Sequence, residues 1–192
     1  MQAKKYELSS PAQPSEWHAY HDIRRRVLFD ARGEAYDENH PDEHAAGNHP
    51  KLLKHQGEAI GVVRIDVAGH QAYFRRVAVH PNAQRRGHGR VLLMLAERFA
   101  GENGCLQVRS YVAPDAVDFY SKCGFAVEQE SVVGPSGRVS VLMSKQLQCI
   151  TFITTHGLGI VTPGVRTTVI LRRAAQAARW ADGLTVRGDD SV

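Results

Sequence analysis

The amino-acid sequence predicts a single α/β domain in which a mixed sheet carries helices on its faces. Runs rich in Val, Ile and aromatic residues recur through residues 1–147, and segments of helical periodicity separate some of them. A strand–loop–helix–strand order within residues 71–112 favours a parallel strand pair, whereas the turns elsewhere favour antiparallel hairpins. Together these observations predict an α+β mixed sheet.

Size and composition are those of a folded protein. The chain has 192 residues, of which 43% are hydrophobic and 23% are charged, so it can fill and cover a core. No segment approaches the ~18 consecutive apolar residues of a membrane span, and the first residues lack the apolar run of a signal peptide. Three cysteines are too few and too scattered for a disulfide framework or a zinc site. We expect a cytoplasmic protein that binds neither a metal nor a membrane.

The net charge of +4 would permit a nucleic-acid partner. The basic residues are mixed with acidic ones, however; Arg24, Arg25 and Arg26 lie close in sequence to Asp30 and Glu34. Such an excess is usually a solvated surface, so nucleic-acid binding is not expected. A polyanionic small molecule would account for the positive bias equally well.

The N-terminal segment predicts a strand, a helix and a long loop. Residues 4–8 can form a short strand, and a Pro-containing segment then breaks the chain. Ser15 can cap a helix, and apolar residues at helical spacing predict that helix over 16–29. Residues 32–50 are polar and rich in His, Asp and Asn, which is typical of a long loop or a short helix, and such loops are often functional.

Three strand signals follow this loop. A short one covers residues 51–55, and a run rich in Val and Ile covers 59–67. After a turn at Gly69 and His70, residues 71–79 alternate between polar and apolar side chains. The last two runs therefore predict an antiparallel hairpin.

The remaining elements complete one continuous architecture. The loop over 81–89 leads into a strongly apolar helix over 90–100, which Gly101 and Gly104 end. Further elements are predicted in this order: a strand over 105–112, a helix over 114–122 that Pro114 opens, and a hairpin of 125–130 with 138–147. We therefore expect one domain over residues 1–147.

The C-terminal extension, residues 148–192, differs in composition. It contains no Lys and no Glu, and apart from His156 its basic residues are all Arg. Residues 150–154 and 165–171 could be strands, and 172–181 a short helix. Three interpretations stay open: an element of a homodimer, a flexible extension, or a shift of reading frame.

The loop from Gln84 to Gly89 has the layout of an anion site. It lies between a strand and a helix, so the unpaired N–H groups and the dipole of the first helical turn face it. Glycines at 87 and 89 let a pyrophosphate approach the backbone. Three arginines add positive charge at the rim: Arg85, Arg86 and Arg90.

Other glycine-rich phosphate loops do not match. A dinucleotide-binding fingerprint needs a third glycine, and position 92 is Leu92. A Walker loop needs Gly-Lys followed by Ser or Thr, which is absent. Taken alone, the glycines could also do no more than shape a turn.

Two segments in this order resemble signatures of the GNAT acetyltransferases. Residues 76–81 followed by Gln84-Arg85-Arg86-Gly87-His88-Gly89 resemble motif A of that family. Ala116-Val117-Asp118-Phe119-Tyr120-Ser121-Lys122-Cys123-Gly124-Phe125 resembles its A-x-x-x-Y-x-K-x-G-F signature. The resemblance covers residues 4–147. It implies a GNAT-type fold, with a central, mostly antiparallel sheet, a splayed parallel strand pair and helices on both faces.

The resemblance also implies an activity: an N-acetyltransferase that moves the acetyl group of the co-substrate acetyl-CoA to a primary amine by direct attack. The pantetheine arm would lie between strands 71–79 and 105–112. The implied cofactor-binding residues are Val77, Ala78, Val79, Arg85, Arg86, Gly87, His88, Gly89 and Arg90. The implied catalytic residue is Tyr120, which would face the sulfur as general acid, although a tyrosine packed in the core is an alternative reading.

Two positions depart from the family pattern. Ala113 stands where the family often has Asn, seven residues before the tyrosine. The strand over 71–79 has no Glu of the kind that many members use as a base, so the general base stays unassigned. A non-catalytic acyl-CoA-binding sensor or assembly module is therefore the alternative function.

The acceptor is not readable from the sequence. Polyamines, antibiotics, amino acids and the amines of peptides and proteins all stay open. His40-Pro41-Asp42-Glu43-His44 matches the H-x-x-E-H string of some zinc proteases, but Pro41 disfavours helical geometry at His40. We expect this segment to cover the acceptor, or else to be a plain solvated loop. Four acidic residues could attract a cationic amine there: Asp37, Glu38, Asp42 and Glu43.

Overall fold

The computed structural model describes residues 6–40, 45–147 and, for the backbone alone, 184–186. The first half contains β1 (Tyr6–Ser9), α1 (Pro14–Arg24), the π-helical turn η1 (Arg25–Phe29), the 3-10 turn η2 (Asp30–Arg32), β2 (Asn48–His55), β3 (Glu58–Ala68) and β4 (Gln71–Val79). The second half contains η4 (Pro81–Ala83), α2 (His88–Glu102), β5 (Gln107–Val112), η5 (Pro114–Ala116), α3 (Val117–Lys122), β6 (Ala126–Val133), β7 (Val139–Gln146) and β8 (Leu184–Val186).

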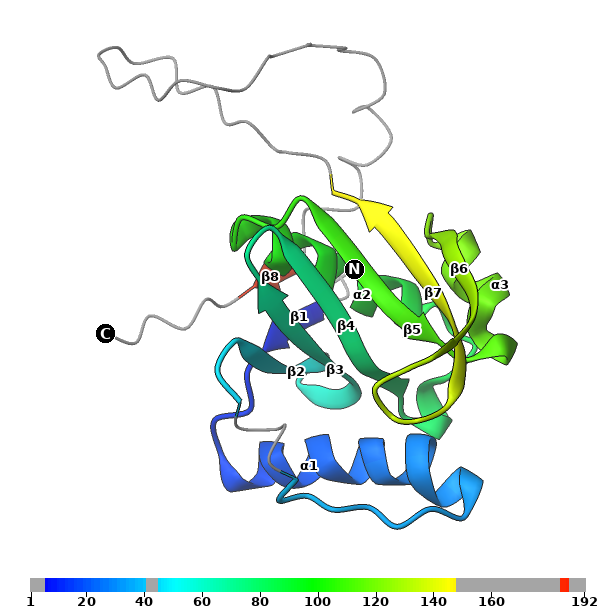
Figure 1. Ribbon diagram of the computed structural model, residues 1–192. Helices are drawn as coiled ribbons and strands as arrows, with labels where there is room; N and C mark the ends of the chain where they lie inside the picture. Colours follow the sequence, from blue (N-terminus) through cyan, green and yellow to red (C-terminus); the bar gives the residue numbers. More distant parts are fainter. Residues whose placement is uncertain (1–5, 41–44, 148–183, 187–192) are drawn as a thin grey trace, which may run out of the picture.

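One sheet joins the strands in the order β6-β7-β5-β4-β3-β2-β1-β8 (Figure 1). Seven of these strands come from residues 6–147, and among them only β4 and β5 run parallel. The predicted mostly antiparallel sheet with one parallel pair is thus confirmed. The eighth strand, β8, was not predicted from the sequence and pairs parallel to β1 at the edge of the sheet.

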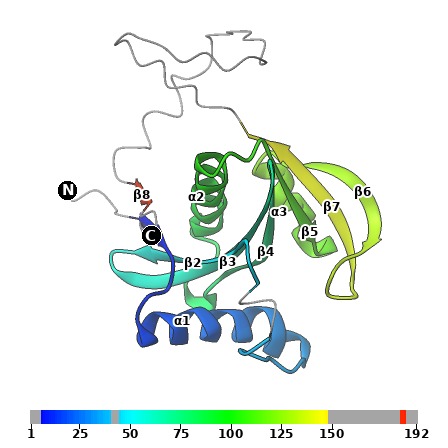
Figure 2. The ribbon, with the colours of Figure 1, turned by 60° about the vertical axis from the view of Figure 1, so that its left-hand side comes forward.

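Helices cover both faces of the sheet. Figure 2 shows α1 on one side of the strands and α2 on the other. The residues of β2 divide between the two faces, because Leu52 packs with Tyr20 and Ile23 of α1 whereas Leu53 packs in the larger core beneath α2. This alternation is what the period of two in a strand requires.

The parallel pair separates along its length. β4 and β5 pair only from Gln71–Gln107 to Tyr73–Arg109. Beyond that point β5 remains paired with β7 as far as Val112, while β4 remains paired with β3. The two strands therefore splay where the sequence analysis expected them to.

A bulge distorts β4 just beyond the splay. The register with β3 shifts between Val62 and Arg64, so that β4 has an extra residue there. Arg76 at the bulge has a φ of 54°, a left-handed conformation that non-glycine residues seldom adopt. Bulges of this kind re-aim side chains and recur beside active sites.

Several predicted boundaries needed correction. The helix expected over 16–29 begins earlier, at Pro14, and Gln13 rather than Ser15 is its N-cap, because the Glu16 carboxylate accepts from the N–H groups of Ala12 and Gln13. Its last turn is π-helical. The helix expected over 90–100 begins at His88 and runs to Glu102, past Gly101.

The predicted boundaries in residues 105–122 needed smaller corrections. Most of the elements predicted in the C-terminal extension cannot be compared with the structure. Helix 114–122 starts as the 3-10 turn η5, and the strand expected from Cys105 begins at Gln107. The strands expected over 150–154 and 165–171, and the helix expected over 172–181, lie outside the described residues. None of the helices in the described ranges is long and apolar enough to span a membrane.

Candidate active site

Tyr120 of α3 lies at the splay between β4 and β5. Its ring is 6% exposed and packs edge-on against Phe119 and Phe125. Its hydroxyl lies 3.4 Å from the hydroxyl of Ser110 on β5, which donates a 3.0 Å hydrogen bond to the main-chain oxygen of Phe74 on β4. A serine hydroxyl has one hydrogen, so Ser110 Oγ is left to accept from Tyr120. At 3.4 Å that second bond is weak, and the tyrosine proton can turn to another acceptor.

The surroundings of Tyr120 keep its hydroxyl protonated. Burial raises the pKa of Tyr120 to about 12. Because the neutral form persists far above neutral pH, the side chain is equipped to donate a hydrogen bond or a proton.

The loop before α2 presents a row of main-chain N–H groups. Arg85 and Gly87 both have left-handed backbone conformations, with φ values of 59° and 84°. Within residues 6–40 and 45–147, the amides of Arg85, Arg86, Gly87 and Gly89 form no hydrogen bond with a protein acceptor. The loop therefore offers several donors at the positive end of a 15-residue helix, an arrangement that binds anions.

The predicted loop residues differ in what their side chains do. Arg85, Arg86 and Arg90 are exposed, as a charged rim requires. His88 instead is 8% exposed and accepts or donates at Nδ1 to Tyr6 of β1, 2.9 Å away. Only the backbone of His88 is therefore placed to meet a ligand of the loop.

Glycine is required at positions 87 and 89 of the loop for two different structural reasons. A Cβ at Gly87 would meet nothing within 4 Å, so the positive φ alone calls for glycine there. A Cβ at Gly89 would lie 3.1 Å from the ring of Phe119, the neighbour of Tyr120. Close packing at Gly89 thus fixes the loop against the helix that carries the tyrosine.

The predicted strand residues line the splay with their backbone. Val77 and Val79 pack against the core beneath α2, whereas Ala78 packs beneath α1. His80 N–H donates to Ile60 of β3, and in an antiparallel ladder this directs the N–H of Val79 away from β3, toward β5. Gln84 donates to the oxygen of Val79 at 2.9 Å and so ties the loop to the strand end.

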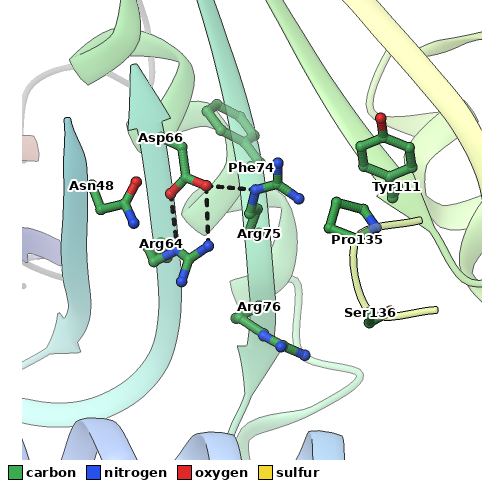
Figure 3. Close-up of a pocket in the computed structure, with 9 residues that line it drawn as sticks. All are labelled: Asn48, Arg64, Asp66, Phe74, Arg75, Arg76, Tyr111, Pro135 and Ser136. Atoms are coloured by element: carbon green, nitrogen blue, oxygen red, sulfur yellow. Dashed lines mark hydrogen bonds and ion pairs between the residues drawn. The ribbon is translucent and has the colours of Figure 1, made fainter. Parts of the chain in front are cut away.

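A cavity of about 280 Å³ opens on the α1 face of the sheet, beside the splay. No pattern in the sequence predicted this cavity. Its lining comes from four strands and the β6–β7 turn: Asn48, Arg64, Asp66, Phe74, Arg75, Arg76, Tyr111, Pro135 and Ser136 (Figure 3). Phe74 links the cavity to Tyr120, because its main-chain oxygen holds Ser110.

An ion-pair cluster shapes one wall of the cavity. Arg64 binds Asp66 with two hydrogen bonds of 2.8 and 3.1 Å, and Arg75 Nε binds the same carboxylate at 2.5 Å. The sequence contains one sign of this wall: Arg64 and Asp66 are charged residues at alternate positions of a strand that is otherwise rich in Val and Ile. Only the fold shows that the neighbouring strand adds Arg75.

The β6–β7 turn, which lines the cavity, contacts the loop after η2. Arg138 forms an ion pair with Glu34, which joins the two segments, and Pro135 and Ser136 line the cavity from the turn. Asp37 and Glu38, expected to attract the acceptor, are exposed and do not line this cavity. Asp42 and Glu43 lie outside the described residues.

Comparison with known proteins identifies the family. The model of the acetyltransferase (GNAT) family matches residues 6–125, which is more than half of the chain. The chain belongs to this family. The matched range contains the splay, Tyr120 and the loop over residues 84–89, called the anion loop below, so the GNAT assignment rests on the same elements as the candidate site.

Individual proteins that are similar to this chain are also named as acetyltransferases. A curated protein of Bacillus subtilis (strain 168), named "Putative acetyltransferase", is 26% identical over 137 residues, which are 67% of this chain and 88% of that protein. The crystal structure titled "putative N-acetyltransferase" from Lactobacillus plantarum has a TM-score of 0.64 and 28% identity, and the match covers 77% of this chain and 100% of that one. Spermidine N-acetyltransferase from Vibrio cholerae, solved with CoA and spermine, shares the fold at a TM-score of 0.59 and 19% identity, over 74% of this chain and 96% of that one.

Proposed function

We propose that this GNAT acyltransferase moves the acetyl group of acetyl-CoA to a primary amine by direct attack, without an acyl-enzyme. The observation that carries the proposal is the position of Tyr120. Its protonated hydroxyl lies at the splay of β4 and β5, 3.4 Å from Ser110, which binds the main-chain oxygen of the cavity residue Phe74, and the neighbouring Phe119 lies against Gly89 of the loop. Donor, thioester and acceptor would therefore meet at one place.

The anion loop would hold the diphosphate of acetyl-CoA. The N–H groups of Arg85, Arg86, Gly87 and Gly89 supply hydrogen bonds, the α2 dipole supplies positive charge, and the exposed arginines supply more at the rim. The pantetheine arm would then run into the splay. There the N–H of Val79 points toward the gap in which β5 no longer pairs with β4.

In the reaction, the amine nitrogen bonds to the thioester carbon while the carbon–sulfur bond breaks. The sulfur leaves with the electron pair, and Tyr120 donates the proton that makes it a neutral thiol. Solvent reprotonates the tyrosine, and the acceptor loses one proton. The products are the N-acetylated amine and the thiol of CoA.

The proton of the acceptor has to leave through water. Among the described residues that line the cavity, Asp66 is the only carboxylate, and its ion pairs with Arg64 and Arg75 make it a poor base. An amine with a pKa near 10.4 requires about 4.6 kcal/mol for deprotonation at pH 7, whereas an α-amino group near 8 requires only about 1.4. The site is thus better suited to amines of low pKa.

The test is free-thiol release from acetyl-CoA across a panel of amines, with Tyr120→Phe as the variant. The substitution keeps the ring and its packing but removes the donor, so kcat should fall roughly ten- to a thousandfold. Calorimetric affinity for acetyl-CoA and the melting temperature should change little. If kcat stays within about twofold while stability drops, Tyr120 is a core residue and the catalytic role is wrong.

The alternative is a domain that binds acyl-CoA without turnover. β4 carries no carboxylate and Ala113 offers no side-chain amide, and both observations favour this alternative. Binding of acetyl-CoA by calorimetry, without thiol release above the rate in buffer for any amine of the panel, would support the binding module.

A further inference from the structure

The cavity beside the splay is lined by more positive than negative side chains. Three guanidinium groups and one carboxylate face it among the described residues: Arg64, Arg75, Arg76 and Asp66. A cationic acceptor such as a polyamine would meet repulsion at such a surface, whereas an acceptor with a negative group would be attracted.

Arg75 has the geometry of a prepared carboxylate binder. Its Nε is committed to Asp66, and its guanidinium lies 5.4 Å from the ring centre of Tyr73 and 5.7 Å from that of Tyr111. These two rings are nearly parallel, at 13°. The carboxylate and the rings hold the guanidinium plane in place before any ligand arrives.

The other edge of this guanidinium faces the cavity. Figure 3 shows the terminal nitrogens of Arg75 directed away from Asp66, toward the side of Tyr111 and Pro135. Within the described parts of the chain, these terminal nitrogens form no hydrogen bond. Two parallel N–H donors at one edge match the two oxygens of a carboxylate.

The β4 bulge brings a second arginine to the same cavity. Neighbouring residues of a regular strand point to opposite faces, yet Arg75 and Arg76 both line this cavity. The left-handed φ of 54° at Arg76 makes this possible, and the guanidinium of Arg76 lies 5.2 Å from the ring centre of Phe29. The unusual backbone thus gathers positive charge at one point of the site.

The size of the cavity limits the ligand. About 280 Å³ lies just below the range of ~300–1,000 Å³ that is typical of sites for drug-sized molecules, so a small acceptor fits it. Phe74 lines the cavity and touches the Ser110–Tyr120 pair through its main-chain oxygen. One end of a small ligand can therefore lie at Arg75 while the other lies at the splay.

We propose that the acceptor is a small amine that also carries a carboxylate, and that Arg75 binds this carboxylate so that the amine points to the splay. This inference rests on the proposed acetyltransferase function and narrows its substrate class to amino acids and short peptides with a free C-terminus.

Matched acceptor pairs test the inference. The probes are the proteinogenic L-amino acids, β-alanine, γ-aminobutyrate and glycylglycine, each compared with its C-terminal amide, and spermidine serves as a cationic acceptor. Thiol release from acetyl-CoA gives kcat/KM for each, calculated on the concentration of neutral amine, because converting the carboxylate to an amide lowers the pKa of a nearby amine. We expect at least one acid to exceed its amide by about 10- to 100-fold, the range for a hydrogen-bonded charge pair. Amides or spermidine as the best acceptors would overturn the proposal.

Variants assign the effect to Arg75. In Arg75→Gln the ratio of kcat/KM for acid to amide should fall toward one, and Arg75→Lys, which keeps the charge but loses the fork, should give an intermediate ratio. Arg98→Gln is the matched control, because Arg98 lies exposed on α2 with Glu102 as its partner, and its ratio should equal that of the unmodified protein. An unchanged ratio in folded Arg75→Gln, verified by its melting temperature, would contradict the assignment.

A binding measurement separates this inference from the catalytic proposal. The N-acetylated forms of the same acids and amides are titrated calorimetrically into the protein with CoA present. Absence of turnover together with acid-selective binding that Arg75→Gln abolishes would reject the catalytic function and support the carboxylate site. Binding without preference for the acids would reject the carboxylate site, whatever the turnover.

Discussion

The hydroxyl of Ser110 donates a 3.0 Å hydrogen bond to the main-chain oxygen of Phe74, one residue beyond the last paired residues of β4 and β5. A side chain thus continues the sheet where the main-chain ladder stops. The same Ser110 Oγ lies 3.4 Å from the hydroxyl of Tyr120. The residue that marks the splay is therefore also the one that orients the proposed acid.

Ser110→Ala should lower kcat by about 2- to 13-fold, the value of a neutral hydrogen bond, with little change in the KM for acetyl-CoA. A double-mutant cycle with Tyr120→Phe is the decisive measurement. If Ser110 acts by positioning the tyrosine, it adds nothing to the loss of kcat in the Tyr120→Phe background. Independent, additive losses would show that Ser110 has only a structural role.

Gly87→Glu should weaken acetyl-CoA binding by more than about a hundredfold, measured by calorimetry, because it places a negative charge at the anion loop. Gly87→Ala is the control. The φ of 84° makes any side chain at this position strained, but no atom lies within 4 Å of its Cβ. The alanine variant should thus report the backbone effect alone, and equal affinities for the two variants would refute the anion site.

The kcat of the enzyme should not decline between pH 7 and 10. Burial raises the pKa of Tyr120 to about 12, so the neutral donor persists through this range, whereas the attacking amine becomes more reactive as it loses its proton. The measurement is kcat against pH at saturating substrates. A descending limb that disappears in Tyr120→Phe would show that the tyrosine ionises earlier than its burial implies.

Glu16 should stabilise the fold only above acidic pH. The hydrogen bonds from Lys54, Ala12 and Gln13 lower the pKa of Glu16 to about 2, from an ordinary value near 4.5. A lowered pKa contributes stability above the unfolded-state value, and this contribution is lost as pH falls toward the folded-state value. Glu16→Gln should therefore lower the unfolding free energy by roughly 1 kcal/mol at pH 7 and by progressively less between pH 4.5 and 2.

Urea unfolding at pH 7, 4 and 3 provides this comparison. Glu102→Gln is the control, since Glu102 forms an exposed i,i+4 pair with Arg98 on α2 and should contribute little at any pH. A deficit of Glu16→Gln that does not depend on pH would mean that charge plays no part in the cap.

A chain that ends at Gln148 should remain folded and bind acetyl-CoA. Among the described residues, the buried members of the two core clusters all lie between Leu8 and Met143, and Leu147 packs against the larger cluster. The pairing of β8 with β1 adds backbone hydrogen bonds at one edge only. Thermal melting should stay cooperative, and loss of cooperativity would show that residues 149–192 belong to the domain.

Periodicity predicted most of the strands and helices of residues 6–147, because burial of one face imposes a period that a sequence displays. The strand over 71–79 was predicted to the residue. The cap at Gln13 was missed, because the glutamine itself carried no signal, and Glu16, which supplies the cap, was read only as part of the helix. β8 was missed because three residues are too short to show alternation.

The sequence by itself predicted the loop over residues 84–89, through its glycine spacing and the helix start, and its resemblance to the GNAT signature predicted Tyr120; both are local patterns along the chain. The cavity was decided by the tertiary structure alone. Asp66 meets Arg75 only because β3 and β4 pair in one register, and Arg76 faces them only because a bulge turns it. Register and bulges depend on how strands pair across long sequence separations, and no local pattern encodes them.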